Sequence, residues 1–450
     1  MPGFVSPPIR VAMAIVIAAI PLAAPLTAGC PCGSAADDRA AAVAGLVREW
    51  IVQLPFDSAT ARLEHVVVGD GLVAAQSTGG SVHAVRSATA GAAGPRAGTV
   101  AWTRPIGDAT GHAWPPTVGS RLVVVATETD VHAIDRDTGK LLWKLPTDAT
   151  TAGAAVESEG WVYVPLQTQR LLRLPADPLA RQTVERPSTT RRGGAKSAPR
   201  MPPESPEPLQ IDLGGRLDAW PMPLAGGVLW STDVGLFALE PMPPEWVRYA
   251  VPESGPPSWI RRAPVALAGP PVVRDTSIFV ATANGGLTRI DLNASKDRTG
   301  LRAAWGVQLP DRPSSGPLVA GDVALVAFGP AGLAAFSTAD GHKLWQSPLV
   351  GTLVAAMGGR AWLIDEVGRL TALDLSSGVR RLSLSLGCFT LPVVNNLTER
   401  LILASPEGLV ASLAPPALPA APAAKRPGPV SDGDRPPAAP APEDPDATPP

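Results

Sequence analysis

The chain contains few side chains that are placed to do chemistry together. Histidine is the side chain that most often moves protons or binds metals near neutral pH, and the five histidines are far apart in the sequence: His65, His83, His112, His132 and His342. His83 and His132 hold the same position in two copies of a repeated segment, which favours packing in equivalent strands over metal binding. The sequence patterns of serine hydrolases, zinc proteases and phosphate-binding loops are absent. We therefore predict no catalytic residues, no bound metal and no cofactor.

The first cysteine predicts a different chemistry, the covalent attachment of a lipid. A basic residue, Arg10, precedes an apolar run from Val11 to Ala24, and small residues then lead to Cys30. This order is typical of a secretory signal peptide, here residues 1–29, and the apolar run is short for a membrane span. The segment Leu26-Thr-Ala-Gly-Cys30 resembles a bacterial lipobox, although Thr27 stands where leucine is usual. The resemblance implies that Cys30 receives a diacylglycerol and becomes the first mature residue; simple secretion with an unmodified Cys30 is the alternative.

The remaining cysteines, Cys32 and Cys388, allow two interpretations. Extracytoplasmic compartments permit disulfides, and a bond between these residues would join the start of the chain to the last part of the repeats. The other interpretation, which the sequence favours, is one thiol in a leader and one separate thiol buried in a strand. The spacing of Cys30 and Cys32 alone lacks the second cluster of ligands that a zinc site needs.

A short repeated pattern organises the rest of the chain and must position any site that the chain carries. Each of eight copies has an apolar residue, a spacer, a small or basic residue and a further residue that is usually apolar. The third residues are Ala84, Ala133, Arg173, Ala238, Arg289, Ala335, Ala372 and Ala411. Strand-type alternation that recurs about every 40 residues is typical of a β-propeller built from four-stranded blades.

The second copy shows the unit in most detail. Two segments rich in β-branched residues, 122–127 and 130–135, are followed by a turn that contains Gly139 and by a third segment that carries Trp143. Glycine adopts the positive φ that such a turn requires, and Gly341 holds the same place in the sixth copy. We predict an antiparallel meander in which Gly139 and Gly341 are turn glycines.

Tryptophan is unusually frequent in these repeats, with 12 tryptophans against two tyrosines in the chain. Several tryptophans begin similar phrases that end in proline, such as Trp143-Lys-Leu-Pro and Trp220-Pro-Met-Pro. A large indole on an outer strand can fill the wedge between neighbouring blades. The predicted wedge residues are Trp50, Trp102, Trp143, Trp305 and Trp345.

One of these tryptophan-containing segments is separated in the sequence from the blade that it completes. Residues 50–55, Trp-Ile-Val-Gln-Leu-Pro, nearly repeat residues 305–310 but precede the first copy, whereas the last copy, around Ala411, ends without such a phrase. We infer that residues 50–55 supply the outer strand of the last blade and so close the ring. The predicted fold is all-β: an eight-bladed propeller of four-stranded antiparallel blades over residues 50–414.

Three segments lie outside the repeats. Residues 30–49 form a leader in which we expect a short helix between Ala35 and Glu49. Residues 176–211 form a basic, proline-rich insertion in blade three, and residues 415–450 form a tail rich in proline and alanine. Both are expected to be disordered because they contain too little apolar surface to fold. The insertion is either a basic arm for anionic lipid or an acidic partner, or a solvated loop with no special role, which the composition favours.

The charge pattern excludes one class of partner. The formal net charge is −2 and charged residues make up 17% of the chain. Because nucleic-acid-binding proteins carry a basic stripe or patch, we predict that this chain does not bind DNA or RNA.

The segment from Ala133 to Trp143, Ala-Ile-Asp-Arg-Asp-Thr-Gly-Lys-Leu-Leu-Trp, resembles the repeat family first recognised in pyrroloquinoline-quinone (PQQ) enzymes. With the signal peptide and the lipobox, residues 50–414 also resemble the BamB family, lipoproteins of the outer-membrane β-barrel assembly machinery. The resemblance implies a monomeric, non-enzymatic scaffold that is anchored to the outer membrane through Cys30, faces the periplasm and binds a protein partner, BamA. An extracytoplasmic sensor or ligand-binding propeller is the main alternative.

A PQQ-dependent quinoprotein dehydrogenase is a further alternative, because the same repeats occur in such enzymes. These enzymes hold the quinone at the axis of the ring with a calcium or lanthanide ion, and many of those that oxidise alcohols carry a disulfide between adjacent cysteines. No two cysteines are adjacent in this chain. The chain after the signal peptide is also shorter than those enzymes usually are, so we expect no enzymatic activity.

Overall fold

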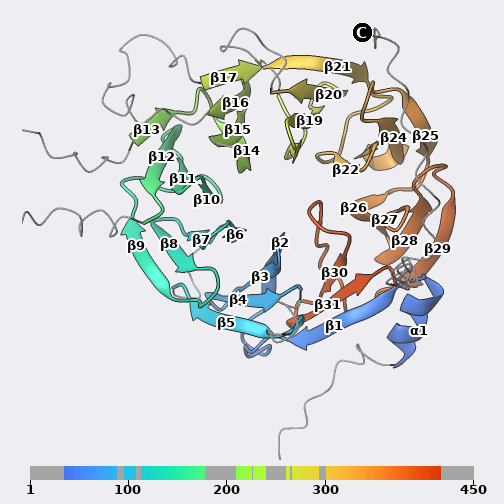
Figure 1. The fold of residues 1–450 in the computed structure, drawn as a ribbon, viewed down its shortest axis with the longest axis horizontal. Helices are drawn as coiled ribbons and strands as arrows, with labels where there is room; N and C mark the ends of the chain where they lie inside the picture. The colour runs from blue at the N-terminus through green and yellow to red at the C-terminus, as the bar shows by residue number, and fades with distance from the viewer. Residues whose placement is uncertain are drawn as a thin grey trace, which may run out of the picture. The chain divides into compact units, whose positions relative to one another are not determined.

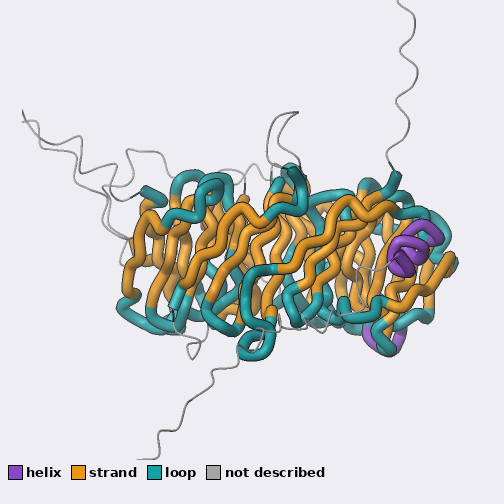
Figure 2. The backbone as a smooth tube through the Cα atoms, turned by 90° about the horizontal axis from the view of Figure 1, so that it is seen from below, coloured by secondary structure: helices purple, strands orange, loops and turns teal. Residues whose placement is uncertain are grey.

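The strands of the computed structural model form blades around a central axis (Figure 1). The structure describes residues 35–88, 96–107, 113–177, 209–224, 227–239, 260–263, 266–292 and 301–416. The predicted signal peptide, Cys30, Cys32, most of the basic insertion and nearly all of the tail lie outside these residues. The prediction of an all-β, eight-bladed propeller is confirmed. Seen from the side, the strands run between two faces of the ring, and loops connect them at both faces (Figure 2).

Seven of the described blades are four-stranded antiparallel sheets in which successive strands are neighbours, from an inner strand to an outer one. Blade 1 contains β2 (Leu63–Gly69), β3 (Leu72–Ser77), β4 (Ser81–Arg86) and β5 (Val100–Pro105). Blade 2 contains β6 (Thr117–Val118), β7 (Leu122–Ala126), β8 (Asp130–Asp135) and β9 (Leu141–Pro146). Blade 3 contains β10 (Val156–Ser158), β11 (Trp161–Leu166), β12 (Arg170–Pro175) and β13 (Leu209–Asp212). Blade 4 contains β14 (Leu217–Leu224), β15 (Gly227–Thr232), β16 (Gly235–Leu239) and β17 (Ile260–Ala263).

Blades 5 to 7 continue in the same order. Blade 5 contains β18 (Val272–Arg274), β19 (Ser277–Thr282), β20 (Gly286–Asp291) and β21 (Arg302–Gln308). Blade 6 contains β22 (Leu318–Ala320), β23 (Val323–Ala327), a 3-10 turn η2 (Gly329–Ala331), β24 (Leu333–Ser337) and β25 (Lys343–Ser347). Blade 7 contains β26 (Gly351–Met357), β27 (Arg360–Asp365), β28 (Arg369–Asp374) and β29 (Arg380–Ser385).

The eighth blade joins the two ends of the ring. Its sheet has the order β1-β31-β30, in which β1 (Val47–Gln53) pairs antiparallel with β31 (Leu409–Ala414), and β30 (Leu401–Ala404) lies inside. A single bridge from Leu391 to Ala404 marks the inner position. The predicted closure by an N-terminal strand is therefore confirmed, although the strand begins at Val47 rather than at Trp50.

Polar contacts of Glu49 strengthen this closure. The guanidinium of Arg400 donates hydrogen bonds of 2.7 and 3.1 Å to the two carboxylate oxygens of Glu49, and the hydroxyl of Ser412 donates one of 3.0 Å. Charge-assisted pairs of this bidentate kind are stronger than neutral hydrogen bonds. Glu49 on the first strand therefore fastens the last blade at two points.

The core lies between the blades rather than in one place. Eight clusters of buried side chains each draw on two neighbouring blades. Successive side chains of a strand point to opposite faces of the sheet; accordingly Val123 packs toward blade 1 and Val124 toward blade 3. Because both faces of each blade are covered, the middle strands are apolar at nearly every position, as in 122–126.

The leader contains helix α1 (Ala35–Val43), which lies against the outside of the ring beside β1. It ends earlier than the expected limit at Glu49 because Gly45 adopts a positive φ of 66°, a common way to end a helix. The amide of Leu46 then donates to the carbonyl of Ala41 at 2.9 Å, and β1 begins at Val47. No helix among the described residues is long and apolar enough to cross a membrane.

The expected insertion of residues 176–211 is ordered at both ends. Ala176 is buried, and residues 209–212 form β13, the outer strand of blade 3. The expectation of disorder for 209–211 is therefore wrong. The alternation Leu209-Gln-Ile-Asp212 is a strand pattern, and pairing with β12 buries Ile211.

Candidate functional site

All five predicted wedge tryptophans lie at the seams between blades. Four of them are 6–8% exposed, and Trp305 is half-buried. Each indole N–H donates to the backbone carbonyl of the residue that directly follows the third strand of the next blade. The acceptors are Ser87 for Trp50, Arg136 for Trp102, Ala176 for Trp143, Thr338 for Trp305 and Leu375 for Trp345, at 2.8–3.4 Å. The same bond thus recurs around the ring and links neighbouring blades.

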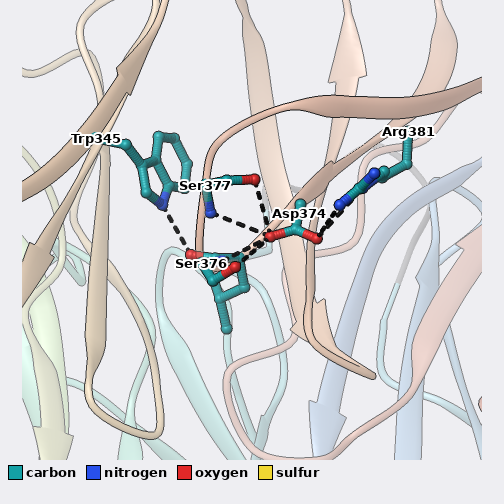
Figure 3. A network of polar contacts seen from close by, with 6 residues as sticks. Trp345, Asp374, Ser376, Ser377 and Arg381 are labelled. Atoms are coloured by element: carbon teal, nitrogen blue, oxygen red, sulfur yellow. Dashed lines mark hydrogen bonds and ion pairs between the residues drawn. The ribbon is translucent and has the colours of Figure 1, made fainter.

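Figure 3 shows one of these links together with the turn that accepts it. The indole of Trp345 donates to the carbonyl of Leu375 at 2.8 Å. Asp374, the preceding residue, accepts bonds from the amides and hydroxyls of Ser376 and Ser377 and from the guanidinium of Arg381 (Figure 3). Hydrogen bonds from Ser376, Arg381 and Ser377 hold the pKa of Asp374 well below its usual range. This carboxylate fixes the turn that receives the indole and is not poised for proton transfer.

The turn glycines Gly139 and Gly341 have positive φ values of 71° and 76°. Each also lies against the tryptophan of the preceding blade. A Cβ atom at Gly139 would approach Trp102 Cγ to 2.4 Å, and one at Gly341 would approach Trp305 Cε3 to 2.6 Å. The turn therefore needs glycine for its backbone conformation and for the close contact with the indole.

Trp220 does not follow the pattern that its phrase indicated. It lies in β14, the inner strand of blade 4, and is 44% exposed. Its ring meets that of Trp114 edge-on, with centroids 6.4 Å apart. The outer strand of blade 4 is β17, where Arg261 pairs with Ala238. The interpretation of Trp220-Pro-Met-Pro as an outer strand is wrong because short proline-rich phrases occur in inner strands too.

Among the described residues, the side chains with catalytic potential are not brought together, and His112 lies outside these residues. The described residues contain no group of three or more histidine, cysteine or acidic side chains that could hold a metal ion. His83 and His132 are buried in the third strands of blades 1 and 2. His83 Nδ1 lies 3.0 Å from the hydroxyl of Thr103, and its ring packs 5.6 Å from that of Phe56. His83 therefore packs against Phe56, in the segment between β1 and β2, and His132 is buried in blade 2.

Burial of these histidines makes stability depend on pH. Burial lowers the pKa of His83 to about 4 from 6.5, and burial and Lys144 lower the pKa of His132. The folded state therefore resists a proton that the unfolded chain accepts below pH 6.5, so stability falls as the pH falls from 6.5 toward 4. We expect His83 alone to remove about 2 kcal/mol between pH 7 and pH 5.

The measurement is the free energy of unfolding at both pH values for the parent protein and for His83→Gln. The variant should lose less stability on acidification than the parent protein. Protonation of His132 should still destabilise both proteins. An equal loss in parent and variant would show that His83 is not the group responsible.

A buried carboxylate, which sequence reasoning missed, links blades 2 and 3. Glu157 is 3% exposed, and its Oε2 accepts bonds from the amides of Arg121 and Leu122 at 3.0 and 2.8 Å. Its Oε1 accepts one from the hydroxyl of Ser120 at 3.3 Å. The inner strand of blade 3 thereby fixes the first hairpin of blade 2. Only the folded ring brings these partners together, since they are about 36 residues apart along the chain.

The segment that precedes β30 is also fixed toward the inside of the ring (Figure 1). Asn395 is 2% exposed; its amide donates to Thr398 Oγ1 and to the carbonyl of Arg400, both at 2.7 Å. Its backbone N–H donates to Val354 of blade 7 at 2.8 Å. The guanidinium of Arg274, from blade 5, donates to the carbonyls of Val319 and Asn396. One segment of blade 8 is thus tied to the inner strands of blades 5 and 7.

The sequence profile of the family described as outer membrane protein assembly factor BamB matches residues 86–182 and 217–410. These two ranges contain more than half of the 450 residues. The chain belongs to the BamB family.

Solved structures similar to this BamB-family chain agree on the fold. BamB from Moraxella catarrhalis has a TM-score of 0.57 and 19% identity, over 82% of this chain and 97% of that chain. The computationally designed Ika8 protein has a TM-score of 0.51 and 10% identity, over 80% of this chain and 98% of that chain. At such identities the likeness concerns the fold alone. A search of curated proteins by sequence gave no match.

One face of this BamB-family propeller carries the two longest connections between strands, those of blades 3 and 4. In an antiparallel blade, the connections between first and second strands and between third and fourth strands lie at the same end. The third-to-fourth connections of blades 3 and 4 run from Pro175 to Leu209 and from Leu239 to Ile260. They are consecutive around the ring and begin and end at one face, and the basic insertion is the first of them.

Cys388 is disulfide-bonded in this BamB-family chain. The interpretation of Cys388 as a separate buried thiol is therefore wrong. The sequence suggested a strand position for Cys388, whereas Cys388 lies in the connection between β29 and β30. The two other cysteines, Cys30 and Cys32, lie outside the described residues.

Proposed function

We propose that this protein is a membrane-anchored scaffold that faces the periplasm and acts in the assembly of outer-membrane β-barrel proteins, with BamA as its partner. The observation that carries the proposal is the match to the BamB family over residues 86–182 and 217–410. The sequence from Leu26 to Cys30 supports a lipid anchor at Cys30, and more than one acyl chain makes such an anchor stable. By this proposal the protein binds rather than catalyses.

The face that carries the long connections of blades 3 and 4 is the part of the ring that we assign to partner binding. Connections vary more readily than the blades they join and often carry function on a rigid scaffold. The tryptophan bonds, the glycine turns and Glu157 make that scaffold rigid at the seams. In the insertion, Arg181, Arg186, Arg191, Arg192, Lys196 and Arg200 add positive charge that suits an acidic surface of the partner.

The test is affinity capture of the full-length protein from gently solubilised native membranes, with mass spectrometry of the co-purified chains and of the mature N-terminus. We expect a BamA-type protein and an acylated Cys30. A Cys30→Ser variant separates the two parts of the proposal, because it should be released from the membrane yet still bind purified periplasmic domains of BamA.

Recovery of the acylated protein with no barrel-assembly protein would overturn the proposed role and favour an extracytoplasmic sensor or ligand-binding propeller. Dye-linked alcohol oxidation after addition of PQQ and calcium would instead identify a quinoprotein dehydrogenase. An unmodified N-terminus that begins at another residue would contradict the anchor.

A further inference from the structure

Cys388 lies at the corner where blade 7 passes into blade 8, between β29 and the bridge at Leu391; residues 386–391 are called the blade 7–8 corner below. The corner is well ordered: the amide of Phe389 donates to the carbonyl of Leu386 at 3.1 Å, and that of Thr390 donates to Cys388 at 2.9 Å. Leu386 and Phe389 are buried in the core cluster between blades 7 and 8, and Cys388 packs against that cluster. A bond at Cys388 is therefore a bond to a fixed part of the ring.

Helix α1 lies beside this corner. A groove of about 50 Å³ is lined by Asp38 and Ala41 of α1, by Arg48 of β1, and by Leu386 and Phe389 of the corner. The helix is held there by the ion pair of Asp38 with Arg48 at 2.8 Å and by a hydrogen bond from Arg360 to the carbonyl of Ala44. Cys32 precedes the first residue of α1 by three positions. Three residues of extended chain span about 10 Å.

The chain has three cysteines, so the partner of Cys388 is Cys30 or Cys32. Under the proposed function the sulfur of Cys30 forms a thioether with the lipid and cannot also enter a disulfide. We propose that Cys32 is the partner of Cys388, and that this bond fastens the lipidated N-terminus to the blade 7–8 corner. This inference rests on the proposed lipid anchor. The two thiols lose two protons and two electrons to a disulfide-bearing oxidant of the extracytoplasmic compartment, and one sulfur–sulfur bond forms.

The bond shortens the tether between the ring and the bilayer. Without it, residues 30–34 separate the acyl chains from α1, a reach of about 17 Å. With it, two residues separate Cys30 from a point fixed to the ring, a reach of about 7 Å. The outer edge of blades 7 and 8 must then lie at the membrane surface.

The side chains at this edge suit a phospholipid surface. Val43 and Val47, in α1 and β1, are 76% and 52% exposed, and Val367 and Val379, in two turns of blade 7, are 81% and 53% exposed. Valine side chains enter the interfacial region of a bilayer, while arginines such as the exposed Arg380 contact lipid phosphates. The two turns lie at opposite ends of β28, so the edge contacts the membrane along the height of the blade.

The covalent part is tested on the full-length protein purified from membranes without reductant, by proteolysis and mass spectrometry. We expect an acylated Cys30 and a peptide pair joined through Cys32 and Cys388 that separates on reduction. An acylated Cys30 with free thiols at Cys32 and Cys388 overturns this inference and leaves the proposed function standing. A bond between Cys30 and Cys388 overturns both the inference and the lipid anchor.

The orientation is tested by hydrogen–deuterium exchange on the protein in vesicles of phosphatidylethanolamine and phosphatidylglycerol. The turns around Val367 and Val379 should exchange at least about twofold more slowly in vesicles than in detergent, and Cys388→Ser should lose this protection while remaining anchored and folded. The turn around Val234 in blade 4, whose side chain is 56% exposed, is the matched control and should not change. Equal protection of both blades, or none in blade 7, would contradict the proposed orientation.

Discussion

Replacing Trp143 with alanine is expected to lower the free energy of unfolding by about 3–5 kcal/mol. The indole is 8% exposed, packs in the core between blades 2 and 3, and donates to the carbonyl of Ala176 at 2.9 Å. The substitution removes this packing, leaves a cavity and deprives a buried carbonyl of its donor. Chemical denaturation followed by circular dichroism measures the change.

Two further variants serve as comparisons: one separates packing from hydrogen bonding, and the other removes an exposed indole. Trp143→Phe keeps most of the apolar contact and should cost about 1 kcal/mol for the lost N–H donor. Trp220→Ala removes an indole that is 44% exposed and should cost no more than about 1 kcal/mol. An unfolding curve of Trp143→Ala that matches that of the parent protein would contradict the assigned role.

Gly139→Ala is expected to cost about 2–4 kcal/mol, although it adds one methyl group. About 1–2 kcal/mol comes from the positive φ of 71°, which an L-residue tolerates poorly. The remainder comes from the contact of the new Cβ with Trp102, 2.4 Å from Cγ, which forces the indole or the turn to move. The shift in the denaturation midpoint measures the total loss of stability from the backbone strain and the contact with Trp102.

Gly368→Ala provides the matched control. Gly368 has a similar φ of 73°, and no atom lies within 4 Å of the position that its Cβ would take. The Gly368→Ala variant should lose only the part of the unfolding free energy that comes from the positive φ, about 1–2 kcal/mol. Equal losses for the two variants would mean that the contact with Trp102 contributes nothing.

The blade pattern was predictable because it depends on residues that are close in sequence. Trp143 and Trp345 follow the third residue of their copies by ten positions, and each pairs directly across the strands with that residue, Ala133 or Ala335. Leu382 has the same spacing from Ala372 and the same pairing. A constant spacing in a hairpin fixes a constant register, so the repeat was sufficient to predict the blade and the closure of the ring.

The contacts between blades were not predictable, because they depend on which distant residues the ring brings together. Nothing near Glu157 in the sequence indicates that its carboxylate accepts the amides of Arg121 and Leu122. Likewise, Asn395 looks like an ordinary loop residue, yet its side chain organises the segment that reaches toward blade 5. Such roles have no local signal, since the partner blades have unrelated sequences at these points.

The pairing of β1 with β31 can form only after nearly the whole chain has been synthesised. Glu49 and Ser412, which meet in this blade, are 363 residues apart. At synthesis rates of about 5–20 residues per second, β1 waits roughly 20–70 s before its partner strand exists. A chain that stops before residue 409 never acquires this partner and keeps an open blade with unpaired strand edges, which proteases and chaperones recognise. Ring closure therefore distinguishes complete chains from truncated ones.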